Sequence, residues 1–243
     1  MGVGYREFPP PPQLRELVEC AWVVDGPPEP VRVLPDGCMD LIRMFGRVVV
    51  AGPDTAAFVD ARGREPFVGL RFRPGALPRL LGVPAAELRN SRVPLIDLGF
   101  AATQGRPLVG LATVLASDEP ANETAPWSLP QLRHVTNSLG KGAAVSDVAR
   151  QVGWSSRTLQ RQCAAVYGYG PATLRRILRF RRAVRLLDDG ASSAAVAAAV
   201  GYADQSHLHR EVRDLTGMSL ATLRQDNAQK RSTDVPSGSV TVA

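Results

Sequence analysis

Several hydrogen-bonding side chains crowd into one short stretch of the sequence, GYADQSHLHREV, residues 201–212. They are Gln205, Ser206, His207, His209 and Arg210. These side chains offer both donors and acceptors, but the stretch is poor in the Glu–Lys pairs at spacing four that a merely solvated helix usually carries. The apolar spacing around them is that of a helix that follows a turn. The stretch could therefore bind a partner through hydrogen bonds, if the surrounding elements turn these side chains outward.

The pattern occurs twice in the second half of the chain. SDVARQVGW (146–154) matches AAVAAAVGY (194–202), and GYGPATL (168–174) matches GMSLATL (217–223). Between the two matched pairs the offset grows from 48 to 49, because the second turn holds one more residue. Each copy has the pattern of a short helix that ends at glycine, a tight turn and a second helix. The repeat predicts two helix-turn-helix units, at about 146–167 and 194–216.

The second helix of each unit has an apolar inner face and a polar outer face. In the first unit Leu159, Cys163 and Val166 share the inner face, and in the second unit Leu208, Val212 and Leu215 do. Arginine and glutamine suit paired hydrogen bonds to the edges of guanine and adenine in the DNA major groove, and serine and histidine adapt to several bases. The predicted DNA-binding residues are therefore Arg157, Gln160, Arg161, Gln205, Ser206, His207, His209 and Arg210, the last open to a phosphate or structural role instead.

The charge distribution favours the same partner. Residues 130–231 hold 16 basic and 7 acidic residues, a net charge of +9, whereas residues 1–129 carry a net charge of −2. A basic half joined to a nearly neutral half indicates that only the second half meets a polyanion. Within a predicted connecting helix at 170–187, Arg179 and Arg182 are candidate phosphate contacts.

Composition excludes several other classes of protein. An apolar content of 44% fits a folded chain, and no apolar run is long enough for a membrane span. The first residues, MGVGYREFPPPP, do not resemble a signal peptide, so we expect a cytoplasmic protein. The three cysteines are widely spaced, which predicts reduced thiols, no metal site and no cofactor.

A segment rich in proline, serine and acidic residues divides the chain. SDEPANETAPWSLP begins at residue 117, so we predict an N-terminal domain at 1–116, a linker at 117–129, a DNA-binding domain at 130–231 and a disordered tail at 232–243. Short apolar runs separated by turn residues predict a mixed, strand-rich α+β first domain, with helical pieces at 12–18 and 75–88. Helical periodicity predicts an all-α second domain of seven helices.

Residues 130–226 resemble the DNA-binding domain, with two helix-turn-helix units, of AraC/XylS-type bacterial transcriptional regulators. The matching motifs are SDVARQVGWSSRTLQRQC, LRRILRFRRAVRLL and VGYADQSHLHREVRDLTGMS. The sequence departs from the family pattern at Leu208 and Val212, where aromatic residues are usual, and at Leu220, where proline is expected. The resemblance implies a sequence-specific regulator, without enzymatic activity, that binds double-stranded DNA by placing one helix of each unit in successive major grooves.

The first half resembles, more weakly, an uncharacterised N-terminal domain attached to some such regulators. The motifs are RVLPDGCMDLI, VAGPDT and GLRFRPGA. In this family the other domain commonly senses a small molecule, dimerises or both, so an effector, a homodimer and contact with RNA polymerase stay open. Asp36, Cys38, Asp40 and Arg73 are weak candidates for a ligand pocket, and they could equally cap turns and pair on the surface.

Two other functions stay open at this point. Such DNA-binding domains are sometimes fused to alkyl-transfer repair modules, and Cys38 is the one attractive acceptor, although three cysteines cannot form the metal-binding quartet that such a site needs. A basic module that binds RNA or acidic protein is the other alternative, but the basic half shows no strands that could display stacking aromatic residues.

Overall fold

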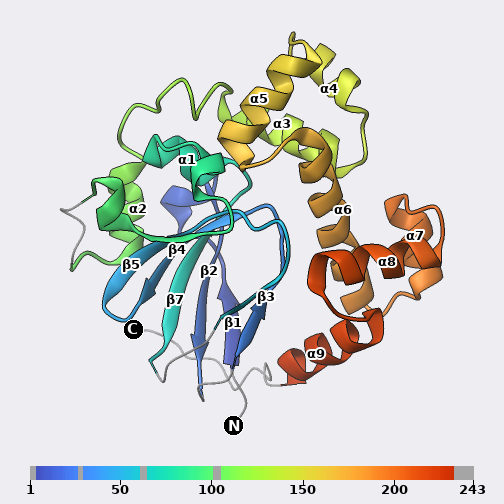
Figure 1. Cartoon of the computed structure of the whole chain (residues 1–243). Helices are drawn as coiled ribbons and strands as arrows, with labels where there is room; N and C mark the ends of the chain where they lie inside the picture. Colours follow the sequence, from blue (N-terminus) through green and yellow to red (C-terminus); the bar gives the residue numbers. More distant parts are fainter. Residues whose placement is uncertain (1–3, 27–29, 61–64, 101–104, 233–243) are drawn as a thin grey trace.

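The structure, a computed structural model of the chain, describes residues 4–26, 30–60, 65–100 and 105–232. A strand-rich N-terminal region is followed by a helical C-terminal region (Figure 1), which confirms the predicted fold class. The tail predicted at 232–243 lies outside the described residues, except for Ser232.

A six-stranded sheet forms the centre of the N-terminal region. Its strands are β1 (Gly4–Phe8), β2 (Val18–Asp25), β4 (Met39–Met44), β5 (Arg47–Ala51), β7 (Phe67–Phe72) and β8 (Arg92–Pro94). They lie in the order β1-β2-β7-β4-β5-β8, and every neighbouring pair is antiparallel. Strands β3 (Val31–Val33) and β6 (Phe58–Asp60) pair as a separate antiparallel ribbon.

The two faces of the sheet are both apolar but differ in what covers them. Leu41, Leu70 and Phe72 lie in the main core, which also contains residues of helices α1 (Ala76–Leu81) and α2 (Leu108–Leu115). Cys20, Trp22 and the other members of a smaller cluster lie apart from that core. A register shift between Val18 and Cys20 accounts for this separation within β2, because Val18 belongs to the main core.

Seven helices form the C-terminal region within the described residues, as predicted. They are α3 (Leu129–Gly140), α4 (Val145–Gln151), α5 (Ser156–Tyr167), α6 (Pro171–Asp188), α7 (Ser193–Val200), α8 (Gln205–Thr216) and α9 (Leu220–Ser232). Helices α3 to α5 and the first half of α6 share one core, and the second half of α6 shares another with α7 to α9. Figure 1 shows α6 as the long helix that joins the two groups.

Several elements of the first region differ from the sequence-based expectations. The helix predicted at 12–18 is wrong: only the short 3₁₀ helix η1 (Pro12–Leu14) forms, and β2 begins at Val18. The helical stretch at 75–88 is confirmed as α1 and the 3₁₀ helix η2 (Ala85–Leu88), separated around Pro84. A third 3₁₀ helix, η3 (Leu95–Leu98), follows β8.

The segment predicted as a linker packs against the first helix-turn-helix unit. Trp127 is buried and stacks on Trp154, with ring centroids 5.2 Å apart. Its carbonyl oxygen accepts a hydrogen bond from Arg79 of α1 at 2.6 Å. The end of this segment therefore belongs to the interface between the two regions.

Candidate nucleic-acid interface

The first unit consists of α4, a turn and α5. Gly153 has a φ of +73° at the turn, a conformation that glycine adopts without strain. Ser155 caps α5 by accepting a hydrogen bond from the backbone N–H of Thr158 at 3.1 Å. Leu159 and Cys163 are fully buried, so the opposite face of α5 is turned to solvent.

The second unit repeats this geometry with α7 and α8. Gly201 has a φ of +81° at the turn, and Asp204 caps α8 by accepting from the N–H of His207 at 2.6 Å. Leu208 and Val212 are fully buried, and Leu215 almost so. Asp204 and Ser155 occupy equivalent positions of the repeat, so the same local interactions begin both exposed helices.

Most of the predicted DNA-binding side chains lie on these two exposed faces. Those classed as exposed are Arg157, Gln160, Arg161, Gln205, Ser206, His209 and Arg210. Nε2 of Gln205 lies 3.4 Å from Nε2 of His209, one turn along α8. The side-chain amide of Gln160 packs against the backbone of Gly170. A Cβ atom added to Gly170 would lie 2.1 Å from Nε2 of Gln160.

His207 differs from its neighbours on α8. Its ring packs edge-on against Tyr202 with centroids 5.1 Å apart, and its Nδ1 lies 3.4 Å from the backbone nitrogen of Ala203. The side chain is only partly exposed. His207 thus supports the turn that precedes α8, while the exposed residues around it point outward.

The two predicted phosphate contacts have different surroundings. Arg179 donates to Glu211 at 3.2 Å and stacks over Tyr202, with its guanidinium carbon 4.2 Å from the ring centroid. Arg176 donates to the same buried carboxylate at 3.0 Å. Because Glu211 belongs to α8, these two arginines attach the second unit to α6, and Arg179 has a structural role.

Arg182 instead lines a cavity of 740 Å³ between the N-terminal region and helices α3 and α6. Arg73, one of the predicted pocket residues, lines the same cavity and donates to the carbonyl oxygen of Arg15. Glu16 and Glu19 also line it and pair with arginines of the helical region, Arg133 and Arg181. The cavity thus combines charged side chains from both regions.

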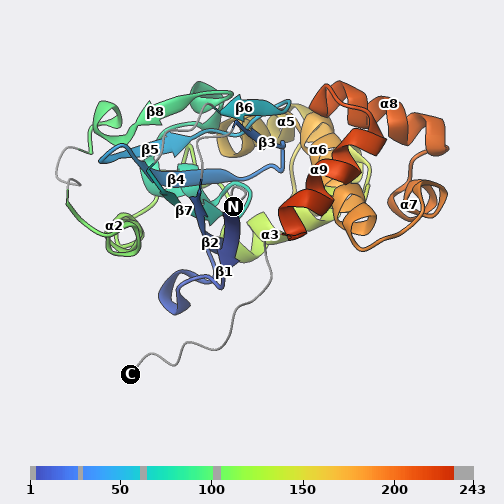
Figure 2. The same ribbon diagram turned by 90° about the horizontal axis from the view of Figure 1, so that it is seen from below.

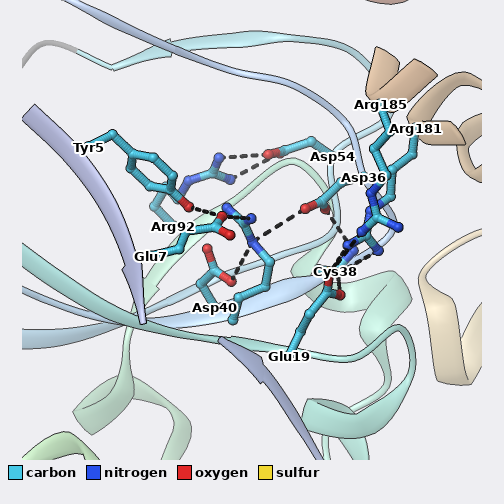
Figure 3. A network of polar contacts seen from close by, with 11 residues as sticks. Tyr5, Glu7, Glu19, Asp36, Cys38, Asp40, Asp54, Arg92, Arg181 and Arg185 are labelled. Atoms are coloured by element: carbon cyan, nitrogen blue, oxygen red, sulfur yellow. Dashed lines mark hydrogen bonds and ion pairs between the residues drawn. The ribbon is translucent and has the colours of Figure 1, made fainter. Parts of the chain in front are cut away.

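The structure brings together the other three predicted pocket residues. Asp36 caps its own turn by accepting from the N–H of Cys38 at 2.8 Å, and it lies 3.4 Å from Nε of Arg71 (Figure 3). Asp40 also lies close to Arg71, with its Oδ1 3.7 Å from the same Nε. Gly37 has a φ of +83°, as expected of a turn at 35–37.

Sequence reasoning missed Arg71, which stands at the centre of this cluster. It also donates to Glu7 at 3.0 Å, so three carboxylates surround one guanidinium. Strand alternation in GLRF, residues 69–72, could have revealed it, because Leu70 and Phe72 face the main core and Arg71 must face the other side. Arg73 does not join the cluster, because the strand ends at Phe72.

Burial changes the proton affinity of two groups in this cluster. Burial raises the pKa of Asp40 to about 7, against the opposing effect of the Arg71 charge. Burial, with the negative charge of Asp36, also raises the pKa of the Cys38 thiol well above its ordinary value. Cys38 is thus held as a protonated thiol, which is a poor nucleophile.

Cys38 also connects the cluster to the connecting helix α6. Its Sγ lies 3.6 Å from Oε2 of Glu19 and 3.5 Å from a guanidinium nitrogen of Arg181. Arg181 pairs with Glu19, as does Arg185 at 3.1 Å (Figure 3). Polar contacts therefore connect Arg71 on the sheet, through Asp36 and Cys38, to Arg181 on α6.

Two negative findings concern the described part of the chain. It contains no group of three or more His, Cys, Asp or Glu side chains placed to hold a metal ion. Its helices are all too short or too polar to cross a membrane.

Two family models match separate parts of the chain. A family model described as a domain of unknown function (DUF6597) matches residues 6–94, and one described as a helix-turn-helix domain matches residues 148–226. No curated protein matches the sequence.

Two solved structures are similar to the chain. They are the crystal structures of ToxT from Vibrio cholerae O395, with a TM-score of 0.43, and of the apo form of a ToxT point variant from Vibrio cholerae strain SCE256, with a TM-score of 0.41. Each is 9% identical in sequence, and each comparison covers 81% of this chain and 88% of the other.

A helix-turn-helix domain in the basic half, with two exposed polar helices, identifies a DNA-binding protein. More narrowly, residues 148–226 form an AraC-type helix-turn-helix domain, joined to an N-terminal domain of unknown function. The chain is thus a DNA-binding transcription regulator, and the predicted resemblance is confirmed.

Proposed function

We propose that this protein regulates transcription by placing α5 and α8 in successive major grooves on one face of a DNA duplex. The observation that carries the proposal is the structural repeat: both helices begin at equivalent caps, bury equivalent apolar residues and expose polar faces. Successive major grooves on one face lie about 34 Å apart. Helix α6 joins the two units as a single continuous 18-residue helix, which keeps them apart.

The exposed side chains divide into candidates for reading bases and candidates for support. Arg157 and Arg161 suit guanine, and Gln205 suits adenine. Gln160, Ser206, His209 and Arg210 complete the proposed contact set. We assign His207 and Arg179 to support, since both contact Tyr202 within the second unit.

We also propose that the N-terminal domain modulates DNA binding. Support comes from the polar contacts that link Asp36 and Cys38 to Arg181 of α6 (Figure 3). A small-molecule effector bound near Asp36, Asp40 or Arg73 would change the charges next to the connecting helix. The domain boundaries at 116 and 130, a cytoplasmic location, a homodimer and contact with RNA polymerase stay predictions.

The reactive-cysteine alternative receives no support from the geometry. Cys38 is buried, and its raised pKa keeps it as the thiol. The negative charges of Asp36 and Glu19 also disfavour the thiolate, against the opposing charge of Arg181.

Hydroxyl-radical footprinting of the full-length protein tests the proposal, on DNA upstream of its own gene and neighbouring genes. Two protected patches on one face of the duplex, about 10 base pairs apart, are expected if both units bind. A single patch would leave α8 as a scaffold and refute the two-groove proposal. Loss of one patch in a Gln205→Ala, Arg210→Ala double variant would assign that patch to α8.

A further inference from the structure

The N-terminal domain contacts the C-terminal ends of both exposed helices, α5 and α8. NH1 of Arg89 donates to the carbonyl oxygen of Gly168, directly after α5, at 3.3 Å. NH1 of Arg32 donates to the carbonyl oxygen of Thr216, the last residue of α8, at 3.1 Å. Gly168 and Gly217 are equivalent in the repeat, so the two acceptors lie within one residue of the same place in each unit.

These contacts satisfy groups that a helix leaves without partners. The last carbonyl groups of an α-helix have no donor within the helix, and the helix dipole makes that end partly negative. An arginine is therefore a favourable partner at both positions. The backbone N–H of Ala57 adds a third bond of this kind, to the carbonyl oxygen of Leu215 at 2.7 Å.

Close packing surrounds the contact with α5. A Cβ atom on Gly168 would lie 2.5 Å from Cγ of Pro53 and 3.1 Å from the carbonyl oxygen of Ala85. A Cβ atom on Gly75 would lie 2.6 Å from Val166, in the last turn of α5. The two regions thus meet here without space for one additional carbon atom.

The contact with α8 comes from the β3–β6 ribbon and the segment before it. Arg32 belongs to β3, and Ala57 directly precedes β6. Figures 1 and 2 show this ribbon at the side of the N-terminal region that faces α8. The contacts to α5 come instead from residues around η2 and α1, so two separate parts of one domain hold the two helices.

We infer that the N-terminal domain acts as a spacer that sets the distance and angle between the two recognition helices, with Arg32 and Arg89 as its positioning residues. The restraint on α5 and α8 is independent of the proposed function; only its effect on DNA binding rests on that function. The two units pack on different halves of α6 and have separate cores, so a second element that contacts both units adds a restraint on their relative position. The N-terminal domain is hydrogen-bonded to the C-terminal ends of both α5 and α8, so it restrains the motion of one unit relative to the other.

The first test measures the spacing without DNA. Spin labels are attached to the full chain at Arg157→Cys and Ser206→Cys, two exposed positions that are equivalent in the repeat; the native cysteines are buried. A single narrow distance distribution is expected. The additional substitutions Arg32→Ala and Arg89→Ala should widen or shift it, whereas Arg47→Ala, an exposed arginine of the same domain, should leave it unchanged.

The second test measures selectivity for half-site spacing. The affinity of the wild-type protein is compared on its operator and on operators with one base pair inserted or removed between half-sites. The Arg32→Ala, Arg89→Ala variant should lose about tenfold of this discrimination, and lysine at both positions should restore part of it because lysine also donates to carbonyl groups.

The two tests separate the failure of this inference from the failure of the proposed function. A distance distribution that is unchanged in the double alanine variant, with calorimetric melting showing a folded chain, would overturn the spacer. If the footprint shows one patch and the spin-label distance distribution widens in the double alanine variant, the two-groove proposal is overturned and the spacer is supported. Retained spacing selectivity in the double variant would also overturn the spacer.

Discussion

Arg157 and Gln205 occupy the first turns of α5 and α8, and the N-terminal residues of a recognition helix are those that usually contact base edges. Arg157→Ala or Gln205→Ala should each relax specificity at one or two base pairs and cost about 1–3 kcal/mol of specific binding. Competition binding against single-base operator variants measures this. Arg47→Ala serves as the matched control, and equal weakening on operator and random DNA would contradict the assignment.

Asp40 makes the stability of the N-terminal domain depend on pH. Burial raises the pKa of Asp40 from 3.8 to about 7, so the folded state holds a proton that the unfolded state releases. The stability that this proton contributes is present below pH 4 and is lost as the pH rises to about 7. Asp40→Asn should therefore match wild type in urea denaturation at pH 4 and exceed it at pH 8.

The exposed residue Asp97 provides the control for this experiment. Asp97→Asn should show the same difference from wild type at both pH values. If Asp40→Asn behaved likewise, Asp40 would titrate as an ordinary surface carboxylate beside Arg71 and Asp36.

The outer faces of α5 and α8 were predictable from the sequence, because helical periodicity and the repeat define which side chains point outward. The neighbours of those side chains were not predictable: His207 lies on Tyr202, and Arg179 is bound to Glu211. Both contacts depend on how a turn or a neighbouring helix is placed in space, which spacing within one helix does not encode.

At the scale of elements, a buried carboxylate adds to the apolar packing that attaches α8 to α6. Glu211 accepts from Arg176 and Arg179, and its side chain is only 8% exposed. Glu211→Gln keeps the shape but removes the charge that both arginines need, so we expect a loss of about 1–3 kcal/mol in unfolding free energy. Urea denaturation measures it.

Asp214 is the control, since it pairs with Arg176 at 3.3 Å but is 65% exposed. Asp214→Asn should cost less than about 0.5 kcal/mol. A comparable cost for both variants would mean that burial of Glu211 contributes nothing to the attachment of α8.

Prediction of elements succeeded in the C-terminal region, where all seven helices were found. Even α4 and α7, with seven and eight residues, have apolar residues at helical spacing and a glycine soon after their last residue. The segment 12–18 has helical spacing and a leading proline, but only the 3₁₀ helix η1 forms there, and the last residue of the segment, Val18, pairs with Phe72 of β7. The strands β1, β2, β6 and β8 were not predicted, and β6 and β8 have only three residues each.

At the scale of the whole molecule, two glycines at equivalent positions of the repeat allow the cost of packing between the regions to be separated from the cost of backbone strain. Gly168 and Gly217 both have positive φ, +82° and +71°. A Cβ atom would clash with Pro53 at Gly168 but meets nothing within 4 Å at Gly217. Gly217→Ala should cost about 1 kcal/mol from strain, and Gly168→Ala about 1–3 kcal/mol more.

Scanning calorimetry measures both costs, and the difference between them reports the interface between the regions. Equal destabilisation by the two substitutions would show that the N-terminal domain does not press on the end of α5. The contact between the regions was beyond sequence reasoning, because no local pattern marks a glycine that faces another domain.

The stacked pair of Trp127 and Trp154 places most of the tryptophan signal in the first helix-turn-helix unit and the segment before it. The sequence has three tryptophans, and the third, Trp22, lies in the sheet. Fluorescence therefore reports on the sheet and the first unit, and the coupled indoles should give a near-ultraviolet circular dichroism band that disappears when the linker detaches. The second unit contains no such chromophore, so α8 can bind or unfold without changing tryptophan emission.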